Sequence, residues 1–192
     1  MKRRARRRRR LLVAGGVGVV AVVVVVLGVS GVFNHVIKEL TLPLRHEDII
    51  RQQANDKGVD ASLIAGVIYA ESRFRDQTSR AGARGLMQIT PTTAHEIERL
   101  SGGTTFKLND LSDPEINIRY GTFYLSYLLE RFDGSEVAAL AAYHAGPSAV
   151  DEWGGSSLTI DEIPFNETRD YVEEVLDKRQ DYRREYGQEL GY

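Results

Sequence analysis

Helix-start signals follow one another along this chain, and no long run of alternating polar and apolar residues interrupts them. A capping residue stands directly before proline at Thr90-Pro91 and at Asp113-Pro114, a pairing typical of the first turn of an α-helix. Further capping residues precede helical patterns at Asp60, Ser135 and Asn166. Because a half-buried strand needs a period of two, the sequence predicts an all-α fold.

The expected helices are separated by breaks that contain glycine or proline. They cover residues 46–57, 61–74, 91–100, 114–132, 136–145, 147–153 and 166–186. The segment 114–132 is apolar on nearly all sides, which indicates a central, buried helix. Arg75 to Thr90, which contains Gly82 and Gly85, is expected to be an ordered loop.

The N-terminal part has a different composition. Residues 1–10 contain eight Lys and Arg residues and no acidic residue, and Leu11 to Phe33 contains no charge. A helix of this length is roughly 35 Å long, enough to cross a hydrocarbon core of about 30 Å. The basic cluster predicts a tail that stays in the cytoplasm. The alternative is a cleaved signal peptide, whose apolar region is shorter.

These features predict a single-pass protein of the cell membrane with its main domain on the extracytoplasmic side. We expect a basic cytoplasmic tail at residues 1–10, a transmembrane anchor at 11–33, a juxtamembrane linker at 34–45 and a helical domain at 46–192.

The net charge of the domain limits its partners. The chain has 25 basic and 27 acidic residues, and without the eight basic residues of the tail 17 basic residues face 27 acidic ones, a net charge of about −10. Nucleic-acid binding needs a basic face, so we expect no nucleic acid partner. The chain has no cysteine, and no spacing of His or carboxylates resembles a metal site, so we expect neither a metal nor a cofactor.

Glu71 occupies a position where an apolar residue is expected. Leu63, Ile64, Val67 and Ile68 form the apolar stripe of the helix 61–74, and the next turn of that stripe falls on Glu71. Apolar neighbours and the C-terminal end of a helix both raise the pKa of a carboxyl group, as a general acid at neutral pH requires. The alternative is a buried salt bridge with a nearby arginine. The candidates are Arg73, Arg75, Arg80 and Arg84.

Two further segments combine residue types that suit ligand binding. "RAGARGLMQITPTTA", residues 80–94, joins loop glycines, the amide of Gln88 and a capped helix start. "AAYHAGPSAVDEW", residues 141–153, ends a helix with Tyr143 and His144 in its last turn. Taken singly, the first segment is equally an ordinary turn, and the second is a core tyrosine followed by an exposed histidine.

Together the segments resemble the catalytic domain of the soluble lytic transglycosylases, the SLT family. "ESRF", "SRAGARGLMQITPTTA", "AYHAGPSAVDEW" and "IPFNETRDYVEEVL" occur in the order of that family over about residues 60–182, and "YGTFYLSYLLERF" resembles its central helix. The resemblance implies a lysozyme-like fold related to goose-type lysozyme. It also implies cleavage of the β-1,4 bond between N-acetylmuramic acid and N-acetylglucosamine in peptidoglycan, without water, leaving a 1,6-anhydromuramoyl end.

The resemblance implies roles for single residues. Glu71 would protonate the leaving oxygen and then, as a carboxylate, take the proton from the muramoyl O6. The residues expected to bind the glycan are Ser79, Gln88, Thr90, Tyr143, His144, Glu167 and Tyr171. His144 stands where the family usually has Asn, and Thr90 where it often has Met, so a hydrogen bond and an apolar contact are expected to differ.

Two other functions are compatible with the same sequence. A lysozyme on this fold would hydrolyse the bond and would need a second carboxylate to activate water, for which Asp76 and Asp110 are candidates. A non-catalytic, anchored glycan binder or envelope component would have no use for a buried, protonatable acid. The reaction product distinguishes the three: anhydro ends, reducing ends or no cut.

Overall fold

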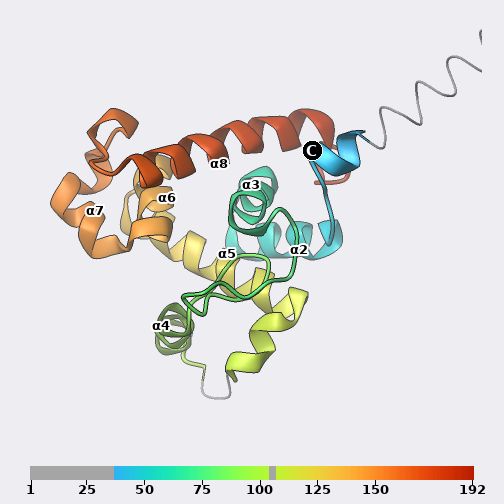
Figure 1. Ribbon diagram of the computed structural model, residues 1–192, viewed down its shortest axis with the longest axis horizontal. Coiled ribbons are helices and arrows are strands. Elements are labelled where there is room, and N and C mark those ends of the chain that lie inside the picture. Colours follow the sequence, from blue (N-terminus) through green and yellow to red (C-terminus); the bar gives the residue numbers. More distant parts are fainter. Residues whose placement is uncertain (1–36, 104–106) are drawn as a thin grey trace, which may run out of the picture. The chain divides into compact units, whose positions relative to one another are not determined.

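The computed structural model describes residues 37–103 and 107–192, and its main compact unit extends from Leu42 to Tyr192. The regular elements of this unit are helices (Figure 1). The α-helices are α2 (Glu47–Lys57), α3 (Ala61–Ser72), α4 (Pro91–Ser101), α5 (Pro114–Arg131), α6 (Glu136–Ala145), α7 (Pro147–Trp153) and α8 (Asn166–Glu185). Three short 3-10 helices are η1 (Leu108–Ser112), η2 (Gly155–Ser157) and η3 (Ile160–Glu162). Pairing of the strand type is confined, within the described residues, to isolated bridges in the loop 73–90, so the all-α prediction is confirmed.

The caps explain where most of these helices begin. The side chains of Asp60, Thr90, Asp113 and Ser135 each accept a hydrogen bond from a backbone N–H of the first turn, as predicted. The prediction that Asn166 caps the last helix was wrong. The carbonyl of the preceding Phe165 accepts the first helical hydrogen bond, so Asn166 already lies within the first turn of α8.

Two helices, α8 and α5, organise the body of the unit. The long helix α8 packs along α3, and the central helix α5 packs against α2, α4 and α6 (Figure 1). Gly66 on α3 permits the close approach of α8, because a Cβ at that position would lie 2.8 Å from the carbonyl oxygen of Val175. The stripe of α3 that was predicted to be apolar is fully buried in this core, which places the C-terminal end of α3 inside the domain.

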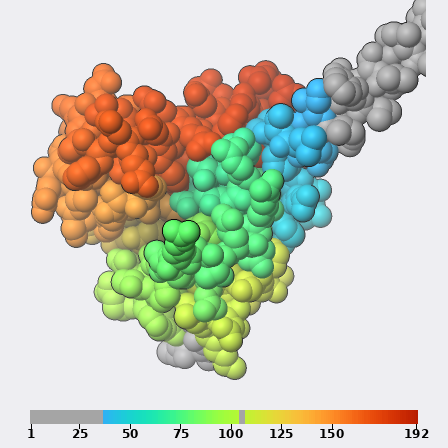
Figure 2. Space-filling model, in the orientation of Figure 1, coloured from blue at the N-terminus to red at the C-terminus, as the bar shows by residue number. Residues whose placement is uncertain are grey.

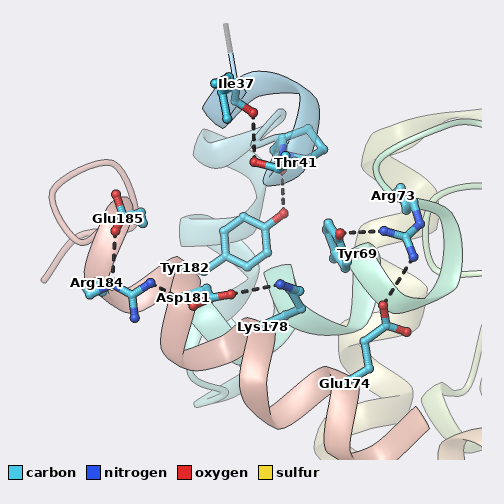
Figure 3. Close-up of polar contacts among 11 residues, drawn as sticks. Ile37, Thr41, Tyr69, Arg73, Glu174, Lys178, Asp181, Tyr182, Arg184 and Glu185 are labelled. Atoms are coloured by element: carbon cyan, nitrogen blue, oxygen red, sulfur yellow. Dashed lines mark hydrogen bonds and ion pairs between the residues drawn. The ribbon is translucent and has the colours of Figure 1, made fainter. Parts of the chain in front are cut away.

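Polar contacts fix α8 to the rest of the unit. The Tyr182 hydroxyl donates a hydrogen bond to the carbonyl of Pro43 at 2.6 Å. Further along, Arg73 at the end of α3 bonds to the Tyr69 hydroxyl and, at 3.4 Å, to the carboxylate of Glu174 on α8 (Figure 3). The Arg73–Glu174 pair therefore joins the end of α3 to α8, and Tyr182 joins α8 to the segment before α2.

The N-terminal unit comprises Met1 to Thr41, of which residues 37–41 are described and helical. The Thr41 hydroxyl donates a hydrogen bond to the Ile37 carbonyl at 2.8 Å (Figure 3). The predicted tail at 1–10 and anchor at 11–33 lie outside the described residues, as does the first part of the predicted linker. In the described ranges, no helix combines the length and the hydropathy needed to cross a bilayer.

Candidate active site

A cleft of about 440 Å³ lies at the C-terminal end of α3. Its walls come from the loop 73–90, the start of α4, the middle of α5, the end of α6 and the start of α8. In Figure 2 the loop, drawn in green, covers the centre of the face shown, with the α6–α8 segments in orange to red beside it. The lining residues are Glu71, Ser79, Ala81, Ala83, Gln88, Ile89, Thr90, Thr93, Tyr124, Tyr143, His144 and Glu167.

Seven of the eight predicted site residues line this one cleft, although they are spread over almost one hundred positions of the sequence. The eighth, Tyr171, is buried behind it on α8. The acidic residues of the lining are Glu71 and Glu167. Asp76 and Asp110 are not among the lining residues, and Asp110 instead accepts a hydrogen bond from the backbone N–H of Lys107.

Glu71 is the last but one residue of α3. Burial raises the pKa of its carboxyl group from 4.5 to about 7, and the hydroxyl of Tyr171 partly opposes this rise. None of the four neighbouring arginines forms an ion pair with Glu71 in the described part of the chain. Arg73 bonds to Glu174, and Arg84 bonds to the side chain of Asn109 at 3.0 Å. The carboxyl group therefore keeps its proton in a substantial fraction of molecules at neutral pH, and no arginine is paired with it.

Tyr171 and His144 stack on one another at the wall of the cleft. Their rings stack with centroids 4.6 Å apart, and Nδ1 of His144 lies 3.2 Å from the Thr168 hydroxyl. The Tyr171 hydroxyl is buried and makes no hydrogen bond of regular geometry within the described residues, but Tyr171 and Glu71 each affect the pKa of the other. Partial burial lowers the pKa of His144, against the opposing charge of Glu167, so the ring is neutral over most of the physiological range.

The loop wall presents fewer free polar groups than its sequence suggests. Gln88 has a φ of 48°, and its Nε2 donates to the carbonyls of Gln77 (3.1 Å) and Gly85 (2.8 Å), so only its Oε1 is free to face a ligand. The Ser79 hydroxyl accepts the backbone N–H of Ala83 at 3.0 Å and keeps its own proton to donate. The Thr90 side chain caps α4, so this residue both starts the helix and lines the cleft.

Tyr143 ties α6 to this loop. Its hydroxyl donates to the Met87 carbonyl at 3.0 Å, and its ring packs against Tyr124 at 5.8 Å between centroids. Burial and the negative charge of Glu71 raise the pKa of Tyr143 well above its usual value, so it stays a neutral hydroxyl. Tyr143 therefore shapes the cleft next to Glu71 without competing for its proton.

Among the residues of this region that the sequence patterns missed, three carry polar side chains. Thr93 and Tyr124 line the cleft, and Asn117, fully buried on α5, bonds to the loop behind it. One signal was available: Asn117 is a polar residue within a helix that is apolar on nearly all sides, where such a residue requires a partner. Within the described residues no cluster of three or more His, Cys, Asp or Glu side chains could hold a metal ion.

The helical fold, with a partly buried acid of raised pKa in its cleft, defines a lysozyme-like class of protein. Comparison with known proteins identifies the family. Residues 48–165 match the family described as "Transglycosylase SLT domain", and the chain belongs to it. The soluble lytic murein transglycosylase of Escherichia coli is 36% identical over 147 residues, covering 72% of this chain and 23% of that protein. The membrane-bound lytic murein transglycosylase E of Buchnera aphidicola is 38% identical over 112 residues, covering 54% of this chain and 51% of that protein.

Solved structures agree with this assignment. An inactive Glu-to-Gln mutant of the lytic transglycosylase Slt from Pseudomonas aeruginosa superimposes with a TM-score of 0.72 at 35% identity, covering 78% of this chain and 26% of that one. The 70 kDa soluble lytic transglycosylase of Escherichia coli gives a TM-score of 0.72 at 33% identity, covering 79% and 26%. The fold prediction is confirmed, and this chain spans about a quarter of the length of these soluble relatives.

Proposed function

We propose that this protein is a peptidoglycan lytic transglycosylase that cleaves the β-1,4 bond between N-acetylmuramic acid and N-acetylglucosamine and leaves 1,6-anhydromuramoyl ends. The observation that carries the proposal is the carboxyl group of Glu71, which lines the cleft, is unpaired by any described arginine and has a pKa of about 7. An acid that must donate a proton and then accept one works best when its pKa is close to the working pH. The inactive Glu-to-Gln form of the Pseudomonas aeruginosa relative is consistent with one essential glutamate.

The proposed reaction needs one carboxyl group and no water. Glu71, protonated, gives its proton to the glycosidic oxygen as the bond from that oxygen to C1 of the muramoyl residue breaks. The O6 hydroxyl of the same sugar then forms a bond to C1 and loses its proton to the Glu71 carboxylate. The proton balance closes, and Glu71 returns to its starting state ready for another cycle.

The other lining residues bind and orient the glycan in this proposal. The free Oε1 of Gln88 accepts a hydrogen bond from a sugar hydroxyl or an acetamido N–H, and Ser79 donates one. Tyr143, His144 and Tyr171 enclose Glu71 and keep water from its carboxyl group, while Glu167 and Thr90 form the rim. The roles of Gln88 and Ser79 use the donor and acceptor atoms that their contacts within the domain leave available.

The location of the reaction follows from the N-terminal sequence. We propose that residues 11–33 anchor the protein in the cell membrane and that the domain acts on glycan strands outside it. The uncharged length of the segment, the basic tail before it and the existence of membrane-bound relatives support this placement.

The product of a digest tests the function. Purified peptidoglycan incubated with the full chain should release muropeptides that are lighter by one water than the products of hydrolysis. Glu71→Gln should lower the rate at least about 10²-fold while the fold persists by circular dichroism. Asp76→Asn, which removes an exposed carboxylate outside the cleft lining, is the matched control and should keep the wild-type rate.

Other products would point to other functions. Reducing ends would show a muramidase, for which Glu167 is the second carboxylate of the cleft lining. Binding without cleavage would show a glycan-binding protein, and near-normal activity of Glu71→Gln would refute the mechanism.

A further inference from the structure

A buried asparagine on α5 holds the loop that forms one wall of the cleft. Asn117 has no exposed surface, and its Nδ2 donates to the carbonyls of Arg84 at 2.9 Å and of Leu111 at 3.0 Å. Its Oδ1 accepts the backbone N–H of Met87 at 2.8 Å. Both amide protons and the amide oxygen are thus used on the backbone, and buried bonds of this kind leave costly unpaired groups when one partner is removed.

Glycines bring the loop and α5 close enough for these bonds. Gly85 has a φ of +76°, and a Cβ there would lie 2.2 Å from Nδ2 of Asn117. On α5, a Cβ at Gly121 would lie 2.4 Å from the sulfur and 2.8 Å from Cβ of Met87. A side chain added at Gly85 or at Gly121 would therefore have to displace the loop segment 84–88 from α5.

The same segment is joined to the residues around Glu71. The backbone of Met87 is held at both ends: its N–H donates to Asn117, and its carbonyl accepts the Tyr143 hydroxyl at 3.0 Å. The Leu86 carbonyl accepts the Ser72 hydroxyl at 2.7 Å, and Ser72 directly follows the proposed acid. The next residue after Met87 is Gln88, which lines the cleft. Side chains from α3, α5 and α6 thus hold this short segment by four hydrogen bonds, and Asn117 supplies two of them.

We propose that Asn117 is a positioning residue of the active site, which sets the placement of Gln88 and Tyr143 relative to Glu71 by holding the segment 84–88. It acts through the loop and does not touch the glycan. The proposal rests on the proposed function, because it concerns the geometry of that same cleft. Misplacing catalytic groups by about 1 Å can cost on the order of 10²-fold in rate.

The test measures kcat, KM and the pH–rate profile of Asn117→Ala on soluble, uncross-linked glycan strands. We expect kcat/KM to fall roughly 10²-fold, with kcat lowered and not KM alone. As the loop relaxes, water reaches Glu71 and the pKa of its carboxyl falls toward the ordinary value. As the pH is raised, the variant should therefore lose activity at a lower pH than the wild type, because the alkaline limb of its pH–rate profile follows the pKa of Glu71. All rates are taken at a temperature at which circular dichroism shows every variant folded.

Thr122→Ala is the matched control. Thr122 is also fully buried on α5, and its hydroxyl has no hydrogen-bond partner in the described residues. Its truncation should lower the melting temperature but leave kcat, KM and the pH profile unchanged. An Asn117→Ala enzyme that behaves like this control would overturn the proposal, because Asn117 would then only stabilise the fold.

A second variant covers the case in which Asn117→Ala does not fold. Gly121→Ala favours the helix and removes no hydrogen bond, yet its Cβ displaces Met87. It should lower kcat by roughly 10-fold, less than Asn117→Ala, and should shift the pH profile in the same direction. A folded Gly121→Ala enzyme with wild-type kinetics would then decide against the proposal. A wild-type protein that releases no anhydro product would instead refute the proposed function, so the two failures are distinguishable.

Discussion

Burial of Glu71 should make the contribution of this group to the stability of the fold less favourable above about pH 7 than below about pH 4.5. The pKa of this carboxyl is raised from 4.5 to about 7 by burial, with the Tyr171 hydroxyl opposing. Below about pH 4.5 both the folded and the unfolded chain carry the proton, so this group has no effect on stability there. Between about pH 4.5 and about pH 7 the unfolded chain has lost the proton that the folded chain keeps, so the free energy of unfolding falls as the pH rises. Above about pH 7 both states are ionised and the full cost is present.

The size of the effect follows from the shift. One pH unit corresponds to about 1.4 kcal/mol, so a rise from 4.5 to about 7 corresponds to roughly 3 kcal/mol. Glu71→Gln keeps the shape of the side chain and stays neutral at every pH. The free energy of unfolding of Glu71→Gln minus that of the wild type should therefore grow by roughly 3 kcal/mol between about pH 4 and about pH 8, while activity is lost. That is a large share of the stability of an ordinary domain.

Urea unfolding of both proteins, followed by circular dichroism at about pH 4, 6 and 8, measures this difference directly. Other titrating groups cancel because they are common to both proteins, and Asp76→Asn reports the effect of removing an exposed carboxylate. A difference that does not change with pH would show that Glu71 titrates with an ordinary pKa. The proposed proton donor would then be ionised at neutral pH, and the mechanism would fail.

Three further predictions concern other parts of the chain. Protease added to intact protoplasts should remove the domain and leave a membrane-bound remnant that contains residues 11–33; full protection of the domain would contradict the proposed topology. His144→Asn should retain activity at lower pH than the wild type, because protonated His144 stabilises the Glu71 carboxylate and so weakens the acid. Partial burial lowers the pKa of His144, and identical acid limbs in the two pH–rate profiles would exclude this role. Tyr192→Phe should lower the free energy of unfolding by about 1 kcal/mol in urea titrations, because the Tyr192 hydroxyl donates to Asp60 at 2.7 Å and accepts the N–H of Ser62 at 3.0 Å; an unchanged midpoint would show that these bonds add no net stability.

The helices and the position of Glu71 could be predicted from the sequence because both depend on local patterns. A capping side chain, a following proline and a period of 3.6 residues act within one or two turns, and the structure confirms them at Asp60, Thr90, Asp113 and Ser135. The failure at Asn166 is also local. Its side chain suits a cap, but the peptide before it already makes the first helical bond.

The hydrogen bonds of the Gln88 amide could not be predicted in this way, since they depend on how the loop 73–90 folds back on itself. The Gln88 amide looked free for a sugar, but carbonyls on both sides of the folded loop take its two protons. Only the folded backbone brings these two carbonyls within reach of the Gln88 amide.

The end of α3 shows why four nearby arginines leave Glu71 unpaired. The sequence pattern predicted a helix that extends to residue 74. If the helical turn continued past Glu71, Arg75 would lie at the i, i+4 spacing from it, which favours an ion pair. Such a pair would lower the pKa of the carboxyl and remove the acid. In the structure α3 ends at Ser72, and the next two residues take positive φ values of 53° and 59°. The chain therefore changes direction immediately after the helix. This reversal buries the ring of Phe74 and turns Arg73 to Glu174 on α8, and the raised pKa of Glu71 therefore depends on the early end of its helix as much as on the apolar stripe before it.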